Sequence, residues 1–285
     1  MEAGVRAALE TLLPGPIGEL NAQGGGNIGD SWCADLASGE RFFVKHYREG
    51  TKGLVDAEAR GLDWLSEADA LPTAKVVTRS DDNALLVLEW IESAPRSAEF
   101  AEKLGRGLAG LHRFGAPGFG FSDPGFIGSL PQANEPCECW ADFYAYRRIE
   151  PLVRRAMDEG SLPAGLAREA SRLLTRFDSL CGPVEEPARL HGDLWGGNVM
   201  LGPRGEAVLI DPASYGGHRE IDLAMMRLFG GFPELTFDAY ANEWPLAEEA
   251  EDRVLFYQLY PLLVHVILFG GGYVDQFAEG LAAYR

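Results

Sequence analysis

The sequence has few cysteines, and their placement excludes a protein held together by disulfides. Only 4 of the 285 residues are cysteine, namely Cys33, Cys137, Cys139 and Cys181, and their spacing is not that of a disulfide framework. We therefore expect reduced thiols. Cys137 and Cys139 flank a single glutamate, but no second pair and no nearby histidine completes a zinc site.

Positive charge and long apolar runs are scarce as well. The 25 Lys and Arg face 43 Asp and Glu, a formal net charge of -18, which argues against nucleic acid or an acidic membrane surface as a partner. No stretch reaches the about 18 consecutive apolar residues of a membrane helix. Residues 1–5 lack the basic and apolar regions of a signal peptide. We expect a cytoplasmic monomer that binds neither nucleic acid nor membrane.

The residues present include a polar, glycine-rich stretch at 190–199. It carries Asp193, and Asn198 follows five residues later; Asp211 ends the strand-like run 207–210. Two short strands joined by a turn at 202–205 would bring Asn198 and Asp211 side by side. Their oxygens suit Mg²⁺, which prefers hard ligands and leaves room for phosphate oxygens. Asp193 is then left as a base, and the pattern indicates an ATP-dependent phosphotransferase with Mg²⁺.

Upstream residues could hold the phosphates of ATP. The loop 24–31 contains Gly25, Gly26, Asn27 and Ile28, and glycines let backbone N–H groups approach phosphates, although a plain flexible hairpin has the same composition. The strand 41–47 places Lys45 on the same face as Phe43 and Tyr47. An amphipathic helix over 55–66 offers Glu58 as its partner.

Each of these residues has an alternative interpretation. Lys45 could extend to water, and Glu58 could be a solvated helix carboxylate. The other candidate partners on the same segment are Asp56, Asp63 and Glu67.

The predicted elements change from strands to helices near residues 90–95, and this change predicts a hinge. Strands are expected over 74–79 and 84–90, and the backbone of Glu89, Trp90 and Ile91 would meet the adenine. We therefore predict a nucleotide-binding lobe over 1–91 and a helical lobe over 92–285. That second lobe has helical patterns at 100–112, 140–157 and 164–180, and a helical tail from 235; its Gly/Pro-rich passage 114–136 is expected to be a functional surface loop.

The interval after Asp211 indicates the class of acceptor. Asp211 is followed by Pro212-Ala213, and only eight residues separate it from Glu220, where the next helical pattern begins. A peptide substrate needs a longer activation segment. Gly192 also replaces the arginine that would pair with a phosphate group on such a segment. A small-molecule acceptor is favoured.

Several runs in this sequence resemble one family of kinases. They are His191-Gly192-Asp193-Leu194-Trp195-Gly196-Gly197-Asn198, Asp211-Pro212-Ala213, residues 217–225, and Leu228-Phe229-Gly230-Gly231-Phe232. Together they are similar to the fructosamine kinase (ketosamine 3-kinase) family from residue 24 to residue 270. The resemblance implies an α+β, two-lobed protein-kinase-like fold, with an antiparallel sheet and one main helix in the first lobe and mainly helices in the second.

The resemblance also implies a reaction, ATP-dependent phosphorylation of the 3-hydroxyl of a small-molecule or protein-bound ketosamine, which contributes to deglycation. Asp193 would accept or orient the hydroxyl proton, and Asn198 and Asp211 would hold Mg²⁺. Lys45, positioned by Glu58, would bind the α- and β-phosphates under the 24–31 loop.

For the acceptor, the resemblance implies contacts from Trp195 and His265, and Asp222 would brace the catalytic loop. From the residues alone, a packing tryptophan and a core histidine are alternatives. Asn27 replaces the cysteine that several family members carry in the glycine loop. Val264, Ile267 and Leu268 replace polar residues of the family, which predicts a drier pocket and leaves open whether ribulosamines, erythrulosamines or fructosamines are preferred.

Two other functions share part of this pattern. An aminoglycoside- or choline-type kinase would use the same fold and the same metal pair. A nucleotide-binding pseudokinase would need no base, so the complete set of Lys45, Asp193, Asn198 and Asp211 argues against it.

Overall fold

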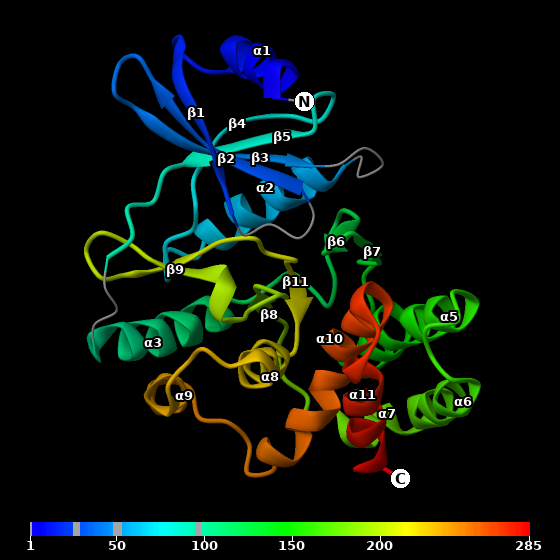
Figure 1. Ribbon diagram of the computed structural model, residues 1–285. Coiled ribbons are helices and arrows are strands. Elements are labelled where there is room, and N and C mark those ends of the chain that lie inside the picture. Colours follow the sequence, from blue (N-terminus) through cyan, green and yellow to red (C-terminus); the bar gives the residue numbers. More distant parts are fainter. Residues whose placement is uncertain (1, 25–28, 48–52, 95–97) are drawn as a thin grey trace.

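The computed structural model describes residues 2–24, 29–47, 53–94 and 98–285, and places a β-sheet above a larger helical part (Figure 1). The first part contains α1 (Glu2–Leu12), β1 (Ile17–Gln23), β2 (Gly29–Leu36), β3 (Arg41–Tyr47), α2 (Leu54–Ser66), β4 (Val76–Ser80) and β5 (Leu85–Glu89). The second contains α3 (Ala98–Phe114), β6 (Gly125–Ile127), β7 (Leu130–Gln132), α4 (Trp140–Phe143), a π-helical turn (Tyr144–Ile149), α5 (Glu150–Asp158), α6 (Ala164–Leu173), a 3₁₀ turn (Leu174–Arg176), α7 (Phe177–Leu180), β8 (Ala188–Leu190), a 3₁₀ turn (Gly196–Asn198), β9 (Val199–Leu201), β10 (Ala207–Leu209), β11 (Tyr215–Gly217), α8 (Glu220–Phe229), α9 (Glu234–Glu243), a 3₁₀ turn (Glu251–Arg253), α10 (Val254–Phe269) and α11 (Gly272–Ala282).

The sheet has the strand order β1-β2-β3-β5-β4, and every neighbouring pair is antiparallel. Side chains alternate across β3, so Phe42 and Val44 pack toward α1 on one face. Phe43 and Tyr47 belong to the cluster of α2 on the other face. The alternation that placed Lys45 with Phe43 and Tyr47 is thereby confirmed, because Lys45 reaches Glu58 on α2.

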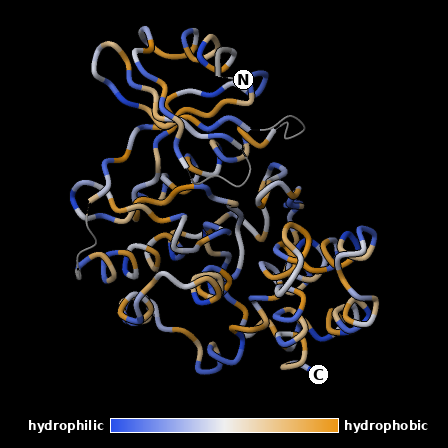
Figure 2. Tube along the Cα trace, viewed as in Figure 1, coloured by the Kyte–Doolittle hydropathy of each residue, from blue (hydrophilic) through white to orange (hydrophobic). Residues whose placement is uncertain are grey.

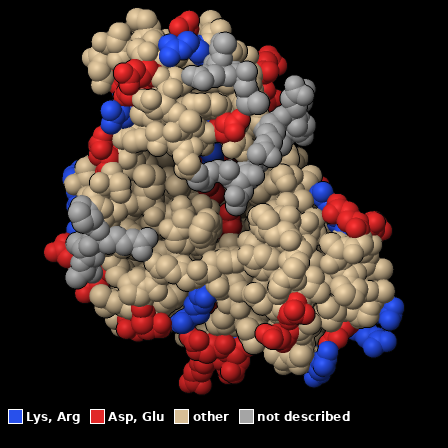
Figure 3. Space-filling model, in the orientation of Figure 1, with Lys and Arg blue, Asp and Glu red and all other residues tan. Residues whose placement is uncertain are grey.

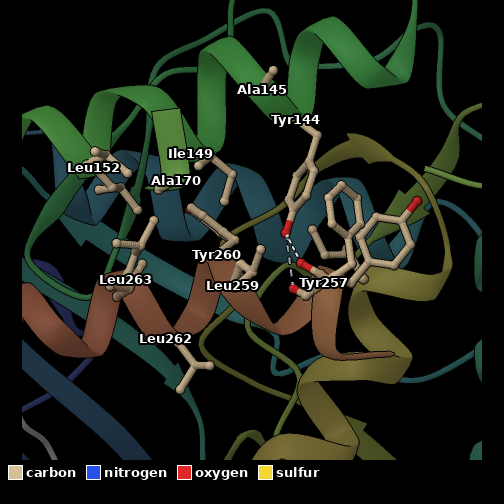
Figure 4. Packing of buried hydrophobic residues seen from close by; sticks show 14 of the residues in the cluster. Tyr144, Ala145, Ile149, Leu152, Ala170, Tyr257, Leu259, Tyr260, Leu262 and Leu263 are labelled. Atoms are coloured by element: carbon tan, nitrogen blue, oxygen red, sulfur yellow. Dashed lines mark hydrogen bonds between the residues drawn. The ribbon is translucent and has the colours of Figure 1, made fainter. Parts of the chain in front are cut away.

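The main core of the helical part surrounds α10. In Figure 4, Leu259 and Leu263 of α10 lie against Ile149 and Leu152 of the opposing helices. The helix is mostly hydrophobic along its length (Figure 2), and the stretch Glu251–Phe269 is long and apolar enough to cross a membrane by composition. Most of that stretch is buried inside the protein, which identifies α10 as the central core helix.

A third cluster joins the two parts of the molecule. Trp64 and Leu65 of α2 share it with Leu201 and Leu209 of the β9–β10 hairpin. Backbone hydrogen bonds cross at the same place, where Ala74 N donates to Leu209 O and Leu209 N donates to Pro72 O, both at 2.9 Å. The catalytic hairpin is therefore held by the first lobe as well as by the second.

Three sequence-based expectations need adjustment. The passage 114–136 contains the hairpin β6–β7, in which Phe126 pairs with Pro131. Strands of three residues that contain Gly and Pro give no alternation signal, so the sequence pattern did not reveal them. The helix expected over 140–157 is interrupted by the π-helical turn, and the one over 164–180 by a 3₁₀ turn. The boundary between residues 91 and 92 stays a prediction.

The contact between α3 and α9 generates a test of the packing. A Cβ added to Gly105 would meet Thr236 O at 2.2 Å and Tyr240 N at 2.9 Å, and two backbones cannot separate by that amount without disturbing the core. We expect Gly105→Ala to lower the free energy of unfolding by about 1–3 kcal/mol in urea titrations. Gly165→Ala on α6 is the control, since its Cβ meets nothing within 4 Å and should be neutral or stabilising. Equal stability of the two variants would contradict this packing.

Candidate active site

The loop that carries Asp193 is fixed by a buried carboxylate. Asp222, near the start of α8, accepts hydrogen bonds from His191 N at 2.8 Å and Gly192 N at 2.9 Å. Its Oδ2 also lies 3.2 Å from His112 Nε2, while Tyr240 Oη lies 2.9 Å from the other ring nitrogen. The predicted brace is present. Burial alone would raise the pKa of Asp222, but the hydrogen bond and charge of His112, the charge of His191 and the Gly192 N–H hold it below its usual range.

Gly192 is required by the geometry of the same loop. Its φ is +82°, and a Cβ would lie 2.1 Å from Ala213 O. The residue that replaces the usual arginine therefore also lets the loop pass close to the segment that follows Asp211.

Asp193 and Asn198 contact each other directly. Asn198 Nδ2 donates to Asp193 O at 2.8 Å and to Asp193 Oδ2 at 3.0 Å. Burial raises the pKa of the Asp193 carboxyl to about 7; the Asn198 hydrogen bond opposes the shift, and the charges of Asp211 and Asp222 add to it. A carboxyl that titrates near neutrality can hold or release a proton under physiological conditions.

Asp211 occupies a strained backbone position at the end of β10. Its φ is 54°, in the left-handed region that few residues other than glycine adopt. The turn brings Asp211 beside Asn198, whose Nδ2 lies 3.5 Å from Asp211 O. The juxtaposition expected from the two short strands is present, and the hairpin register Leu209↔Val199 produces it.

Lys45 connects the two lobes at this point. Its Nζ lies 2.8 Å from Glu58 Oε1 and 2.9 Å from Asp211 Oδ1. Burial would lower the pKa of Lys45, but the charges of Glu58 and Asp211 outweigh that effect and raise it well above its usual value. The predicted Lys45–Glu58 pair is confirmed. The sequence analysis assigned no role to Tyr47, whose hydroxyl donates to Glu58; its place two residues after Lys45 on the same strand face could have suggested it.

The competing carboxylates of α2 have other partners or lie elsewhere. Asp56 pairs with Arg79 at 2.8 Å, and Glu67 pairs with Arg189 at 2.9 Å. Asp63 makes no side-chain hydrogen bond or ion pair among the described residues and is exposed. Glu58 is therefore the carboxylate of this helix that faces Lys45.

A cavity of about 540 Å³ opens in front of these groups and extends toward α10 and α11. Figure 3 shows acidic atoms at the bottom of the hollow between the lobes. Trp195 lines it with 41% of its surface exposed, which excludes the alternative of a buried packing residue. His265 lines the same cavity and lies 4.5 Å from the ring of Phe229 and 4.8 Å from that of Tyr273, between ring centroids.

The end of the cavity next to α10 and α11, here named the acceptor end, is largely apolar and aromatic. Val264 and Leu268 line this end, which agrees with the prediction of a drier pocket. Burial lowers the pKa of His265, and its Nδ1 lies 2.8 Å from Pro261 O. The other imidazole nitrogen is then the one that can meet a ligand. The sequence analysis did not single out Arg60 or Phe126, which also line the cavity.

The structure does not test the other predicted nucleotide contacts. Gly25, Gly26, Asn27 and Ile28 fall outside the described residues. Glu89, Trp90 and Ile91 do not line the cavity as the described residues form it, and the Glu89 N–H already donates to Lys75 O at 2.9 Å. Their contact with adenine stays a prediction.

The donor set next to Asp193 fits a magnesium ion that binds together with phosphates. The side-chain oxygen of Asn198 and Oδ2 of Asp211 have no hydrogen-bond partner within the part of the chain that is described. No group of three His, Cys, Asp or Glu side chains in that part could hold a metal by itself. Mg²⁺ commonly binds one or two protein ligands and completes its shell with water and phosphate oxygens.

Comparison with known proteins identifies a family. Residues 7–284 match the family model described as fructosamine kinase. A Synechocystis protein with the provisional name ketoamine kinase is 35% identical, with 93% of this chain and 90% of that protein covered. A chloroplastic protein-ribulosamine 3-kinase of Arabidopsis thaliana is 33% identical, with 90% and 79% covered.

Solved structures agree with this family and with the fold. A Thermobifida fusca protein provisionally named fructosamine-3-kinase superposes with a TM-score of 0.90 at 40% identity, covering 98% of this chain and 97% of that one. The choline kinase LicA of Streptococcus pneumoniae gives 0.69 at 18% identity, with 100% and 99% covered. At that identity LicA shows the fold alone, and it confirms the α+β, two-lobed kinase-like architecture expected from the sequence.

The Asp222 brace predicts a pH-dependent loss of stability. The pKa of Asp222 in the folded protein lies below the ordinary aspartate value of about 3.9. The carboxylate therefore stabilises the fold above about pH 3.9, and this contribution is lost as the pH falls through the folded pKa. Asp222→Asn should lower the free energy of unfolding by about 3 kcal/mol at pH 7. The difference in stability from wild type should shrink below about pH 4. Urea unfolding between pH 3 and 7 measures this, with the exposed Glu248→Gln as control. A constant difference across that range would show that the Asp222 charge is not responsible.

Proposed function

Because the chain belongs to the fructosamine kinase family, we propose that it transfers the γ-phosphate of ATP to the 3-hydroxyl of a ketosamine. The observation that carries this proposal is that Asp193 lines the same cavity as the Lys45–Asp211 ion pair and the rings of Trp195 and His265. A phosphate donor on one side and a sugar on the other would meet at this carboxylate.

Asp193 acts on the acceptor hydroxyl in this mechanism. Its Oδ2 is occupied by Asn198 Nδ2, so Oδ1 is the atom that accepts or orients the 3-hydroxyl proton. The Asn198 contact fixes the direction of the carboxylate, which limits misorientation of the nucleophile. The raised pKa of Asp193, about 7, makes it a stronger base than an exposed aspartate.

Lys45, Glu58, Asn198 and Asp211 serve the nucleotide. Glu58, which accepts a hydrogen bond from the Tyr47 hydroxyl, holds Lys45 Nζ where the α- and β-phosphates would lie. Asn198 and Asp211 would hold Mg²⁺, which supplies positive charge to the transferring phosphoryl group when bound. The glycine loop 24–31 and the backbone of residues 89–91 are proposed to cover the phosphates and the adenine.

For the acceptor we propose a ribulosamine or erythrulosamine in preference to a fructosamine. The Arabidopsis relative is named for ribulosamine, and the apolar side chains of Val264 and Leu268 offer no hydrogen bonds to additional sugar hydroxyls. A cytoplasmic location and a monomeric state complete the proposal.

A substrate screen distinguishes this function from its relatives. ADP formation should be measured with ribulose-lysine, erythrulose-lysine, fructose-lysine, choline and an aminoglycoside under identical Mg·ATP conditions. We expect turnover with the ketosamines, highest with the ribulose or erythrulose adduct. Turnover with choline or the aminoglycoside alone would refute the ketosamine assignment. No turnover with any of the five would favour a nucleotide-binding pseudokinase.

Two isosteric variants test the division of roles. Asp193→Asn should reduce kcat by roughly 10²- to 10⁴-fold, because it removes a group that acts in the transition state, and it should leave the Kd for Mg·ATP nearly unchanged. Asp211→Asn should instead raise that Kd, because it removes a metal ligand and a Lys45 partner. Calorimetric titration with a non-hydrolysable ATP analogue measures both. Equal losses of nucleotide affinity would refute the assignment.

A further inference from the structure

We infer that Arg60 forms an anion-binding subsite at the acceptor end of the cavity, and that the enzyme selects ketosamines carrying their own carboxylate or phosphate. This inference rests on the proposed function and specifies its substrate class. The observation behind it is a guanidinium that lines the cavity and has, in the part of the chain that is described, one long hydrogen bond as its polar contact.

The hydrogen bonding of Arg60 is incomplete. Among the described residues its buried Nε has no partner, and its single hydrogen bond there, from Nη2 to Pro124 O, measures 3.5 Å, at the limit for such a bond. No carboxylate lies within ion-pair distance of it among the described residues. A guanidinium offers five N–H donors in a planar fork that matches a carboxylate or a phosphate. A desolvated donor without an acceptor is unfavourable, and an incoming anion would relieve that cost.

The other cation of the cavity wall is already neutralised. Lys45 is held by Glu58 and Asp211 and belongs to the nucleotide. Glu58 and Arg60 are two residues apart on α2, so their side chains leave the helix roughly 200° apart. Glu58 contacts Lys45, whereas Arg60 leaves the helix on a different side and reaches Pro124 O.

The surroundings of Arg60 belong to the acceptor end. Its contact Pro124 precedes the β6–β7 hairpin, which packs on α2. A Cβ on Gly128, at the tip of that hairpin, would lie 3.0 Å from Leu268 Cδ1 on α10, and His265 is on the same helix. Arg60 and His265 are thus on walls of one cavity that the hairpin connects.

The subsite favours particular acceptors. A ketosamine formed on a free amino acid keeps a carboxylate, whereas a lysine inside a polypeptide has its carboxyl group in a peptide bond. A phosphate on the sugar would offer the same chemistry from the opposite end of the acceptor. Either anion can form a bidentate pair with Arg60. An internal protein-bound adduct lacks the carboxylate, and it carries a phosphate only when the sugar itself is phosphorylated.

Matched acceptors test the inference. Ribulose adducts of 6-aminohexanoic acid and of its primary amide differ in charge at constant length, and adducts of glycine and glycinamide repeat the comparison at short length. A 5-phosphorylated ribulose adduct of 6-aminohexanamide tests the phosphate. We expect kcat/KM to be at least about tenfold higher for an acid or a phosphate than for the matching neutral adduct, as for a charged hydrogen-bonded pair.

Variants assign the preference to Arg60. Arg60→Gln should bring that ratio close to one, and Arg60→Lys should restore part of it. Arg79→Gln is the control, since Arg79 pairs with Asp56 on α2 and does not line the cavity; it should keep the wild-type ratio. Thermal unfolding of each variant checks that the fold is retained.

The outcomes separate the two proposals. Turnover of all adducts with a ratio near one in the wild type, or a ratio that Arg60→Gln does not change, would overturn the Arg60 subsite and leave the ketosamine kinase intact. A higher KM for ATP in Arg60→Gln with every acceptor would reassign Arg60 to the nucleotide and overturn the inference as well. No turnover of any adduct would refute the proposed function. Calorimetric binding of the acid and amide adducts to wild type and Arg60→Gln then decides the subsite by the same ratio.

Discussion

The arrangement of this site depends on one ammonium group shared between two lobes. Lys45 Nζ contacts Glu58 on the main helix of the first lobe and Asp211 on the catalytic hairpin of the second. All three groups are partly or fully withdrawn from water, so the position of each charge is determined by the others. Glu58 has a further donor in Tyr47, which means that the strand, the helix and the hairpin are fixed by a single hydrogen-bonded cluster. A cluster of this kind aligns the residues that are proposed to bind the nucleotide.

The second lobe prepares its own part of the site with strain and burial. Asp211 has a positive φ, and Gly192 passes so close to Ala213 that a Cβ has no room. Asp222 offsets these costs by accepting two backbone N–H groups of the loop and contacting His112. The result is an Asp193 carboxyl whose direction is set by Asn198 and whose pKa is raised toward neutrality by burial. A carboxylate on a mobile surface loop would have neither property.

The sequence predicted those contacts of the site that arise from local patterns, and it did not predict those that depend on the packing of distant elements. The Lys45–Glu58 pair and the contact of Asn198 with Asp211 follow from strand alternation, helix position and a short hairpin, and all three are local patterns. Tyr47 was identifiable in principle, because it shares the strand face of Lys45. Arg60 was not, since its significance comes from the lack of a partner, and a missing partner is visible only when every neighbouring element is in place. The β6–β7 hairpin was not predicted for a related reason. Its short strands have no pattern of their own, and the hairpin packs on α2.

In a protein with a net charge of -18, a guanidinium such as that of Arg60, which has no carboxylate partner among the described residues, is a scarce site of positive charge. An acidic protein repels the anions that it must bind, so it needs local positive charge that its own carboxylates do not neutralise. Lys45 does not satisfy that requirement alone, because Glu58 and Asp211 already contact it, and the nucleotide site would depend on Mg²⁺ for additional charge. At the acceptor end, where the walls are aromatic and aliphatic, the guanidinium of Arg60 is the described cation without a carboxylate partner. A neutral acceptor would leave the buried Nε of that guanidinium without an acceptor, whereas an anionic acceptor could complete its hydrogen bonds. The electrostatics of the cavity therefore distinguish acceptors by charge at a position where the apolar walls distinguish them by shape.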